Sequence, residues 1–247
     1  MVRLDNIGKR FGELMVIHDL SFDFEKGKKY ALIGPNNCGK TTLLYLIAGF
    51  YRQSSGNIFF QDGVSKNLKN VTVHSRSHLG IGLTFQDPRG FVDFSVKDNL
   101  AISMMDRGSD SLLGSGKYPL KDDDNESIDS LLRRGGLVSS KFDKLSFLSY
   151  GQRKVMDFLC LLARNCKLFL LDEPFAGIDQ VSADILTQLI LNEAINNDKT
   201  ILIVSHEIPL VSEIVDEIIL MEEGNLIVHG EPKKILASEV FKRVYLS

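Results

Sequence analysis

The stretch that decides the fold is Gly34-Pro35-Asn36-Asn37-Cys38-Gly39-Lys40-Thr41-Thr42. Apolar residues 30–33 precede it and mostly apolar residues 43–48 follow it, which predicts a strand, a tight loop and a helix. In that context the backbone N–H groups of the loop and of the helix N-terminus point inward and bind phosphate oxygens. Lys40 then offers a charged donor to the terminal phosphates, and Thr41 offers a hydroxyl to Mg²⁺. A chance match on a glycine-rich turn is the alternative, and the flanking strand and helix disfavour it.

Three residues of this loop suit a sharply bent backbone. Gly34 and Gly39 lack a Cβ, so the chain can turn tightly and approach a ligand closely. Asn37 stands where such loops commonly carry a glycine, and asparagine tolerates left-handed geometry better than most residues. The loop therefore remains compatible with phosphate binding.

Length and composition limit the classes of protein to which the chain can belong. A length of 247 residues allows one large α/β domain or two small ones, and 44% hydrophobic with 25% charged residues is ordinary for a globular protein. A formal net charge of −3 gives no basic footprint, so nucleic acid is not favoured as the main partner. Cys38, Cys160 and Cys166 lack metal-ligand spacing and fit a reducing compartment. No apolar run approaches the length of a membrane span and no signal peptide is evident, so any membrane role is expected to come through a partner.

The N-terminal part of the chain predicts β structure. Residues 2–24 suggest two strands around a turn at Gly12, and residues 57–61 suggest another strand. Phe11, just before that glycine, is either an ordinary core aromatic or a flat face on which a purine ring stacks.

The middle of the chain predicts an inserted helical subdomain. Residues 79–85 form an apolar run that ends at Gln86, which is either a solvated polar cap or a metal or water ligand at the carboxyl edge of a sheet. Residues 96–105 and 128–132 suggest helices, and the Gly/Ser-rich and acidic stretch at about 107–126 suggests a mobile surface loop between them.

Two later stretches carry polar groups at the ends of elements. Ser149 and the bare backbone of Gly151 open a largely apolar helix and suit an anion, although serine is also a common N-cap. Residues 168–171 form a buried strand that ends in Asp172 and Glu173, and burying the two carboxylates unpaired would cost several kcal/mol per ion. We therefore expect Asp172 in a Mg²⁺ shell and Glu173 as the group that orients and deprotonates water, rather than solvation of both acids.

The C-terminal third predicts one more core strand, residues 201–205, followed by His206. A single histidine is usually structural, but this strand should end at the same sheet edge as Gly34 and Asp172, so contact with the γ-phosphate is expected. Beyond it, the pattern predicts a hairpin around Glu223-Gly224, a short helix over 232–237 and a tail over 241–247.

Together, in this order, the motifs resemble those of the ATP-binding subunits of ABC transporters over essentially the whole chain. The resemblance identifies GPNNCGKTT (34–42) as the P-loop, Gln86 as the centre of the Q-loop, LSYGQ (148–152) as the signature, LFLLDEP (168–174) as the Walker B strand with its catalytic glutamate, Gly177-Ile178-Asp179 as the D-loop and His206 as the switch histidine. It implies an α/β P-loop NTPase fold, with a RecA-like mixed sheet core, an antiparallel β-subdomain and an inserted α-helical subdomain. The implied ranges are 1–90 and 165–230 for the sheet core, 91–164 for the helical subdomain and 231–247 for a C-terminal helix and tail.

The resemblance also implies the site residues of an ATPase. Catalysis would fall to Glu173, His206 and Lys40, and the metal, Mg²⁺, to Thr41, Gln86 and Asp172. ATP-binding residues would be Phe11, Gly34, Pro35, Asn36, Asn37, Cys38, Gly39, Lys40, Thr41, Thr42, Gln86, Ser149, Gly151, Gln152 and Asp179.

Small departures from the usual motifs of the family indicate which of its subgroups the chain resembles. Tyr150 replaces a glycine common in the signature, and Asn37-Cys38 replace two small residues common in the P-loop. LSYGQ, AGFYRQSSG, GIGLTFQ and DEPFAGID look like the branched-chain amino acid and urea importer ATPases, and the C-terminal stretch is also similar to the lipopolysaccharide-export ATPase.

The resemblance implies a head-to-tail pair of ATPase subunits, identical or closely related. Each nucleotide would lie between the P-loop of one subunit and Ser149 and Gly151 of the other. The pair would drive permease subunits from the cytoplasmic face of the membrane, docked near Gln86 and the inserted subdomain. A soluble ABC-type ATPase acting on nucleic acid and a P-loop kinase remain alternatives. The net negative charge opposes the first, and LSYGQ with His206 is left unexplained by the second.

Overall fold

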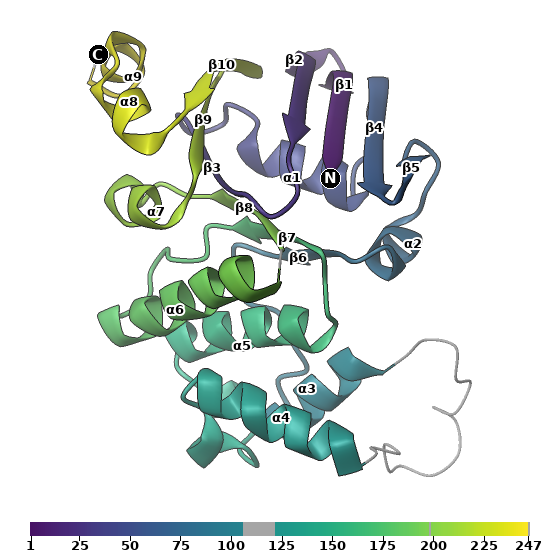
Figure 1. Ribbon diagram of the computed structural model, residues 1–247, viewed down its shortest axis with the longest axis vertical. Coiled ribbons are helices and arrows are strands. Elements are labelled where there is room, and N and C mark those ends of the chain that lie inside the picture. The colour runs from purple at the N-terminus through teal and green to yellow at the C-terminus, as the bar shows by residue number, and fades with distance from the viewer. Residues whose placement is uncertain (106–121, 198, 247) are drawn as a thin grey trace. The chain divides into compact units, whose positions relative to one another are not determined.

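The structure is a computed structural model that describes residues 1–105, 122–197 and 199–246. The chain divides into two compact units, whose elements are labelled in Figure 1. The first unit comprises Met1–Gln86, Cys166–Ala176 and Leu191–Ser247, and the second comprises Asp87–Asn165 and Gly177–Ile190.

A six-stranded mixed sheet forms the centre of the first unit, in the order β10-β9-β3-β8-β7-β6. Its strands are β3 (Lys29–Ile33), β6 (Ile81–Thr84), β7 (Leu168–Asp172), β8 (Thr200–Val204), β9 (Glu217–Glu222) and β10 (Asn225–Gly230). All neighbouring pairs are parallel except β9 and β10, which form the predicted hairpin. Its turn residues Glu223 and Gly224 have φ of 45° and 77°, the positive values that a two-residue hairpin favours.

The register of this sheet brings several strand ends to one edge. Asp172 pairs with Val204, Leu32 also pairs with Val204, and Thr84 pairs with Leu171. The residues that follow β3, β6, β7 and β8 therefore emerge together. This confirms the expectation that Gly34, Asp172 and His206 lie at the same sheet edge.

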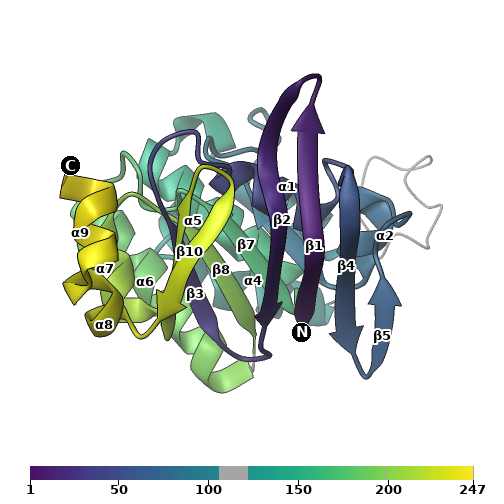
Figure 2. The ribbon, with the colours of Figure 1, turned by 90° about the horizontal axis from the view of Figure 1, so that it is seen from above.

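A second, antiparallel sheet completes the β structure of the first unit, in the order β2-β1-β4-β5. Figure 2 shows its strands side by side. They are β1 (Val2–Phe11), β2 (Leu14–Phe24), β4 (Ser55–Asp62) and β5 (Val64–Asn67). The β9–β10 turn joins the two sheets, because the His18 N–H donates to the Gly224 carbonyl at 3.0 Å. Inward-facing residues of both sheets and of α1 (Lys40–Ala48) form one hydrophobic core.

Helix α1 ends against a buried arginine that the sequence did not single out. Arg76 of α2 (Val73–His78) donates through Nη1 to the carbonyls of Leu46 and Ile47 at 2.6 and 2.9 Å. The same guanidinium also donates to the Leu68 carbonyl at 2.6 Å. A cation at a helix C-terminus satisfies its unpaired carbonyls and opposes its dipole. Burial lowers the pKa of Arg76 to about 10.

The second unit is helical. It contains α3 (Val96–Met104), α4 (Asp122–Arg134), the 3₁₀ turns η2 (Val138–Ser140) and η3 (Leu145–Phe147), α5 (Tyr150–Ala163) and the first part of α6 (Gln180–Asn197). The acidic residues 122–126, expected within a surface loop, instead begin α4. That expectation was wrong because acidic side chains at a helix N-terminus oppose the dipole, so an acidic run can start a helix as readily as a loop. The remainder of the expected loop, 107–121, lies outside the described residues.

The C-terminal end also differs from expectation. Helix α7 (Ile208–Ile214) and the predicted short helix, α8 (Pro232–Ala237), are followed by α9 (Glu239–Leu246) where a tail was expected. Phe241 and Tyr245, one helical turn apart, stack with ring centroids 4.8 Å apart. Such i, i+4 pairs stabilise a helix that composition alone leaves undecided.

The boundaries of the units also differ from the expected ranges. The chain passes into the helical unit after Gln86, earlier than the expected residue 91, and segment 177–190 groups with the helical unit. The physical reason for the second difference is a tight contact. Gly151 has no room for a Cβ, which would lie 2.4 Å from Ser182 Oγ and 2.7 Å from Asp179 Oδ2.

Candidate active site

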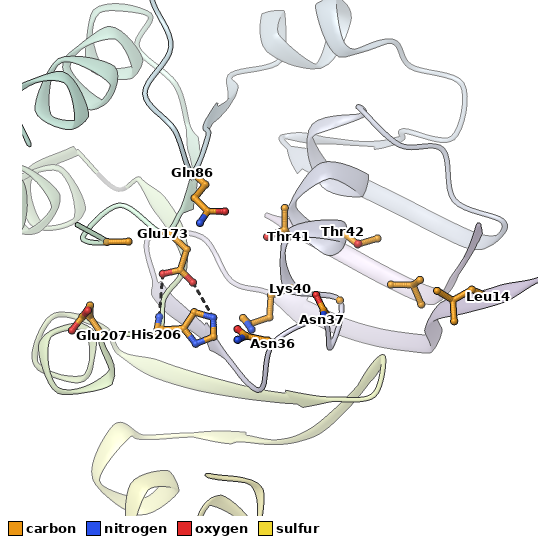
Figure 3. A pocket seen from close by; sticks show the side chains of 13 residues that line it. Leu14, Asn36, Asn37, Lys40, Thr41, Thr42, Gln86, Glu173, His206 and Glu207 are labelled. Atoms are coloured by element: carbon orange, nitrogen blue, oxygen red, sulfur yellow. Dashed lines mark hydrogen bonds and ion pairs between the residues drawn. The ribbon is translucent and has the colours of Figure 1, made fainter. Parts of the chain in front are cut away.

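A pocket of about 580 Å³ lies at the sheet edge where the strand ends meet. Figure 3 shows the side chains of Gln86, Glu173 and Lys40 pointing into it. It is lined by Leu14, Val16, Asn36, Asn37, Gly39, Lys40, Thr41, Thr42, Gln86, Glu173, Ala176, His206 and Glu207. Residues from five separate parts of the chain therefore share one space.

The loop 34–39 has the backbone geometry expected from its sequence. Asn37 and Gly39 have φ of 62° and 107°, both in the left-handed region. A Cβ on Gly34 would lie 2.0 Å from the Met221 carbonyl oxygen, so only glycine fits there. Lys40 Nζ donates to the carbonyls of Gly34 and Pro35, each at 2.8 Å. The ammonium is thus held at the centre of the loop, where it can exchange these carbonyls for phosphate oxygens.

Asp172 lies behind the loop and is fully buried. Its Oδ1 accepts a hydrogen bond from Thr41 Oγ1 at 3.1 Å, although the two residues are 131 apart in sequence. Thr41 and Gln86 line the pocket, and Asp172 contacts Thr41 without lining the pocket itself. Together they offer a hydroxyl, an amide and a carboxylate oxygen. Hard cations such as Mg²⁺ prefer oxygen ligands, so the donor set fits that ion.

Glu173 and His206 contact each other twice. The His206 backbone N–H donates to Glu173 Oε2 at 3.1 Å, and His206 Nε2 lies 3.3 Å from Oε1, as the dashed lines in Figure 3 mark. Burial, reinforced by the positive charge of Lys40, lowers the pKa of His206, so the imidazole is neutral at neutral pH. The carboxylate is thereby fixed in orientation beside the lysine.

Phe11 and Cys38 do not line the pocket. Phe11 is 40% exposed, packs edge-on against Tyr51 and lies under Lys9 Nζ, while Leu14 and Val16 of the following strand line the pocket instead. Cys38 is only 5% exposed, and burial raises the pKa of its thiol despite the nearby Lys40. A position near a helix N-terminus tends to lower the pKa of a thiol, but for Cys38 desolvation outweighs the positive field.

The remaining expected site residues belong to the second unit. Ser149 and Gln152 form a capping box at the start of α5: the Gln152 N–H donates to Ser149 Oγ at 3.2 Å and the Ser149 N–H to Gln152 Oε1 at 2.9 Å. Asp179 accepts from the backbone N–H and the hydroxyl of Ser182, which lowers its pKa. Gly151 is buried beside them. These contacts define their conformations within that unit.

Sequence reasoning missed several residues of the pocket. These residues are Leu14, Val16, Ala176 and Glu207. Two of them could have been expected from the sequence, because Ala176 closely follows the Walker B strand and Glu207 directly follows His206. Tyr245 of α9 was also missed. Burial raises the pKa of its phenol to about 12. No signal in the sequence indicated that this tyrosine of the C-terminal helix would be partly buried.

Comparisons with known proteins agree on one family. A sequence model described as "ABC transporter" matches residues 17–176, more than half of the chain. The chain belongs to the ABC transporter ATPase family. Among its curated relatives is the lipopolysaccharide export system ATP-binding protein LptB of Escherichia coli (strain K12), 32% identical over 98% of this chain and 95% of the relative. Another is a probable branched-chain amino acid transport ATP-binding protein, LivG, of Archaeoglobus fulgidus, 31% identical over 100% of this chain and 95% of the relative.

Solved ABC cassettes share the fold. A nucleotide-free ATP-binding cassette from an ABC transporter superposes with a TM-score of 0.86 at 28% identity, covering 100% of this chain and 99% of the other. A cassette in its ADP conformation superposes with a TM-score of 0.84 at 28% identity, covering 100% and 98%. The expected P-loop NTPase fold is confirmed, and the chain is an ATP-binding, ATP-hydrolysing subunit of an ABC transporter.

Proposed function

We propose that this ABC ATPase powers a membrane permease that imports amino acids or a similar small solute. The observation that carries the motor role is the pocket in which the P-loop, Gln86, Glu173 and His206 meet. The LivG relatives support the solute class, because their names assign them to branched-chain amino acid transport. None of the helices in the described part of the chain combines the length and apolar content that crossing a membrane requires.

The geometry supports a division of labour for hydrolysis. Lys40 and the N–H groups of the loop bind and orient the phosphates. Glu173 accepts the proton of the attacking water, and His206 holds that carboxylate in place through its two contacts. Thr41, Asp172 and Gln86 would hold Mg²⁺, whose charge offsets that of the phosphates.

The proposal also assigns roles to five residues that do not line the pocket, namely Phe11, Ser149, Gly151, Gln152 and Asp179. We place Phe11 at the adenine, and the other four across the interface of a head-to-tail pair of subunits at the membrane's cytoplasmic face. Support comes from the exposure of Phe11 and from the capping box that presents Ser149 at the start of a helix. A partner subunit would then complete each site with the N-terminus of its own α5.

Export of a lipopolysaccharide-type substrate is the second candidate. It is favoured by LptB, which matches 98% of this chain at 32% identity. The motor chemistry is the same in both proposals, so the site residues do not separate them.

Purification of the tagged chain from native membranes tests the proposal. We expect a membrane permease to co-purify, and ATP hydrolysis by the reconstituted complex to rise with branched-chain amino acids rather than with lipopolysaccharide. Stimulation by lipopolysaccharide alone would favour the exporter. Co-purification of RNA or DNA in place of a membrane protein would contradict both. The Lys40→Ala variant, which lacks the phosphate-binding ammonium, is the matched inactive control.

A further inference from the structure

The segment that follows Gln86 is attached to helix α5 by two side-chain contacts within the helical unit. Tyr150 Oη donates to Asp87 Oδ1 at 3.3 Å, and the Arg89 backbone N–H donates to Asp157 Oδ2 at 3.0 Å. The proposed catalytic chemistry uses neither Tyr150 nor Asp157. We call Asp87, Arg89, Tyr150 and Asp157 the α5 latch.

The spacing of Tyr150 and Asp157 places both residues of the latch on the same face of helix α5. Tyr150 and Asp157 are seven residues apart, which places them on one face of α5 two turns apart. Lys154 lies between them on the same face, is buried, and has its Nζ 5.7 Å from the Tyr150 ring. On the other side of the contact, Asp87 and Arg89 are two residues apart in the segment that follows Gln86. Each end of the segment therefore meets its own turn of the helix.

Burial gives the Asp157 contact its specificity. Asp157 is partly buried, and desolvation raises its pKa to about 7, opposed by the Arg89 N–H and by the charges of Lys154 and Arg89. The pKa values of Tyr150 and Cys160, on the same helix, are raised by burial and, to a smaller extent, by the charge of Asp157. A partly desolvated carboxyl group that keeps one backbone N–H as its partner fixes the position of that backbone.

The latch connects the segment after Gln86 to the start of α5 next to Ser149, and the proposed function uses both Gln86 and Ser149. Gln86 ends the first segment of the first unit and lines the pocket, while Ser149, next to Tyr150, is the N-cap of α5. Tyr150 stands where related signatures commonly carry a glycine, and a glycine would leave Asp87 without this donor. Phenylalanine at 150 would keep the ring and lose only the hydroxyl.

We propose that Tyr150 and Asp157 are positioning residues that hold the segment after Gln86 against α5, so that a displacement of Gln86 is passed to Ser149 and back. This inference rests on the proposed function, in which Gln86 and Ser149 act on the two sides of the nucleotide. Neither residue of the helix touches the reacting atoms. Their effect is on the arrangement in which Gln86 and Ser149 act.

Amide hydrogen exchange of the full chain tests the contact. The Asp157→Leu variant removes the acceptor, and we expect exchange of the Arg89 amide to become about tenfold faster, the loss of one hydrogen bond. Asp157→Asn retains a carbonyl acceptor and should keep the Arg89 amide within about threefold of the native rate. Exchange of the P-loop helix α1, in the first unit, is the control for global destabilisation. An unchanged Arg89 amide in Asp157→Leu, or equally faster exchange in α1, would overturn the contact.

Steady-state kinetics test the positioning role. Tyr150→Phe and Asp157→Leu should each lower kcat for ATP about threefold to tenfold with KM unchanged, and Asp157→Asn should restore kcat towards the native value. Rates are normalised to the fraction of protein that binds nucleotide, so loss of folded protein does not mimic the effect. Tyr150→Phe combined with Asp87→Ala should lose no more than either change alone, because both remove the same contact.

The kinetic outcomes are separable from failure of the proposed function. Failure of branched-chain amino acids to raise ATP hydrolysis by the reconstituted complex would contradict the proposed function, while hydrogen exchange would still measure the latch. Normal kcat in Tyr150→Phe and Asp157→Leu, with a fast Arg89 amide, would overturn the positioning role. So would additive losses in the Tyr150→Phe, Asp87→Ala cycle.

Discussion

Glu173 adopts a left-handed backbone conformation, with φ of 47°, directly after strand β7. Non-glycine residues rarely take this conformation, and such strain often accompanies a functional position. Here the backbone N–H of Glu173 still donates to the Val204 carbonyl at 2.9 Å, while its carboxylate turns to His206. The strained backbone therefore presents the carboxylate to the pocket without losing the sheet hydrogen bond.

At the residue scale we predict that Glu173→Gln binds ATP with native affinity but turns it over about 10²–10⁴-fold more slowly, because the general base is lost at constant shape. Steady-state hydrolysis and titration with a fluorescent ATP analogue measure the two effects. Lys40→Ala is the contrasting variant and should raise the nucleotide dissociation constant itself. Near-native turnover in Glu173→Gln would remove this residue from the role of base.

Cys38 gives a second prediction at this scale. Because the thiol is buried and its pKa is raised, we expect it to react with iodoacetamide far more slowly in the folded protein than in urea. The rate should increase as the pH rises, since the thiolate is the nucleophile. Mass spectrometry of timed samples measures this. Labelling in the folded state as fast as in urea would contradict the burial.

At the scale of elements, Arg76 connects α2 to the end of the P-loop helix. We predict that Arg76→Met destabilises the protein by about 2–4 kcal/mol, since several buried carbonyls lose a charged donor. Arg76→Lys, which keeps the charge without the planar fork, should recover only part of this loss. Urea denaturation followed by circular dichroism measures both. If Arg76→Met lowers the free energy of unfolding by less than about 0.5 kcal/mol, the hydrogen bonds from Arg76 to the end of α1 do not stabilise the protein as predicted.

Helix α5 gives a prediction about pH. The pKa of Asp157 is about 7 in the folded state and about 3.9 in an unfolded chain, so between these values the folded state binds more protons. The contribution of Asp157 to the free energy of unfolding is therefore fully present below about pH 4. As the pH rises towards 7, the free energy of unfolding falls by up to about 4 kcal/mol. The free energy of unfolding of Asp157→Asn should lack this dependence. Parallel curves for the native protein and Asp157→Asn from pH 4 to 8 would contradict the shift.

At the scale of the whole molecule, the two halves of the proposed ATP site belong to different units. Lys40 lies in the first unit and Ser149 in the second. We predict that Ser149 acts in trans, so a mixture of Ser149→Arg and Lys40→Ala proteins should regain part of the ATPase activity that each lacks. One composite site of the mixed pair then has two intact halves. The rate of the native protein should also climb with its concentration.

Two outcomes would contradict action in trans for the isolated subunit. One is a hydrolysis rate independent of protein concentration. The other is an ATP-loaded Glu173→Gln protein that stays monomeric by light scattering. The ATPase would then need its permease, or a different ATPase partner, to assemble the site.

Local patterns were enough to predict much of this protein. The loop 34–42, the strand ending in Asp172 and Glu173, and the hairpin at Glu223-Gly224 depend on neighbouring residues whose geometry is fixed by glycine, by charge and by alternation. Their order along the chain indicated the fold and the family. Parallel strands end at a common edge, so the meeting of Gly34, Asp172 and His206 also followed from the sequence.

Only the tertiary structure decided the features that depend on burial between distant segments. The raised pKa of Cys38, the capping of α1 by Arg76 and the attachment of Arg89 to Asp157 are of this kind. An arginine, an aspartate or a cysteine looks the same in sequence whether it faces water or the interior. Desolvation and long-range hydrogen bonds set its charge and its role, and both are fixed by packing alone.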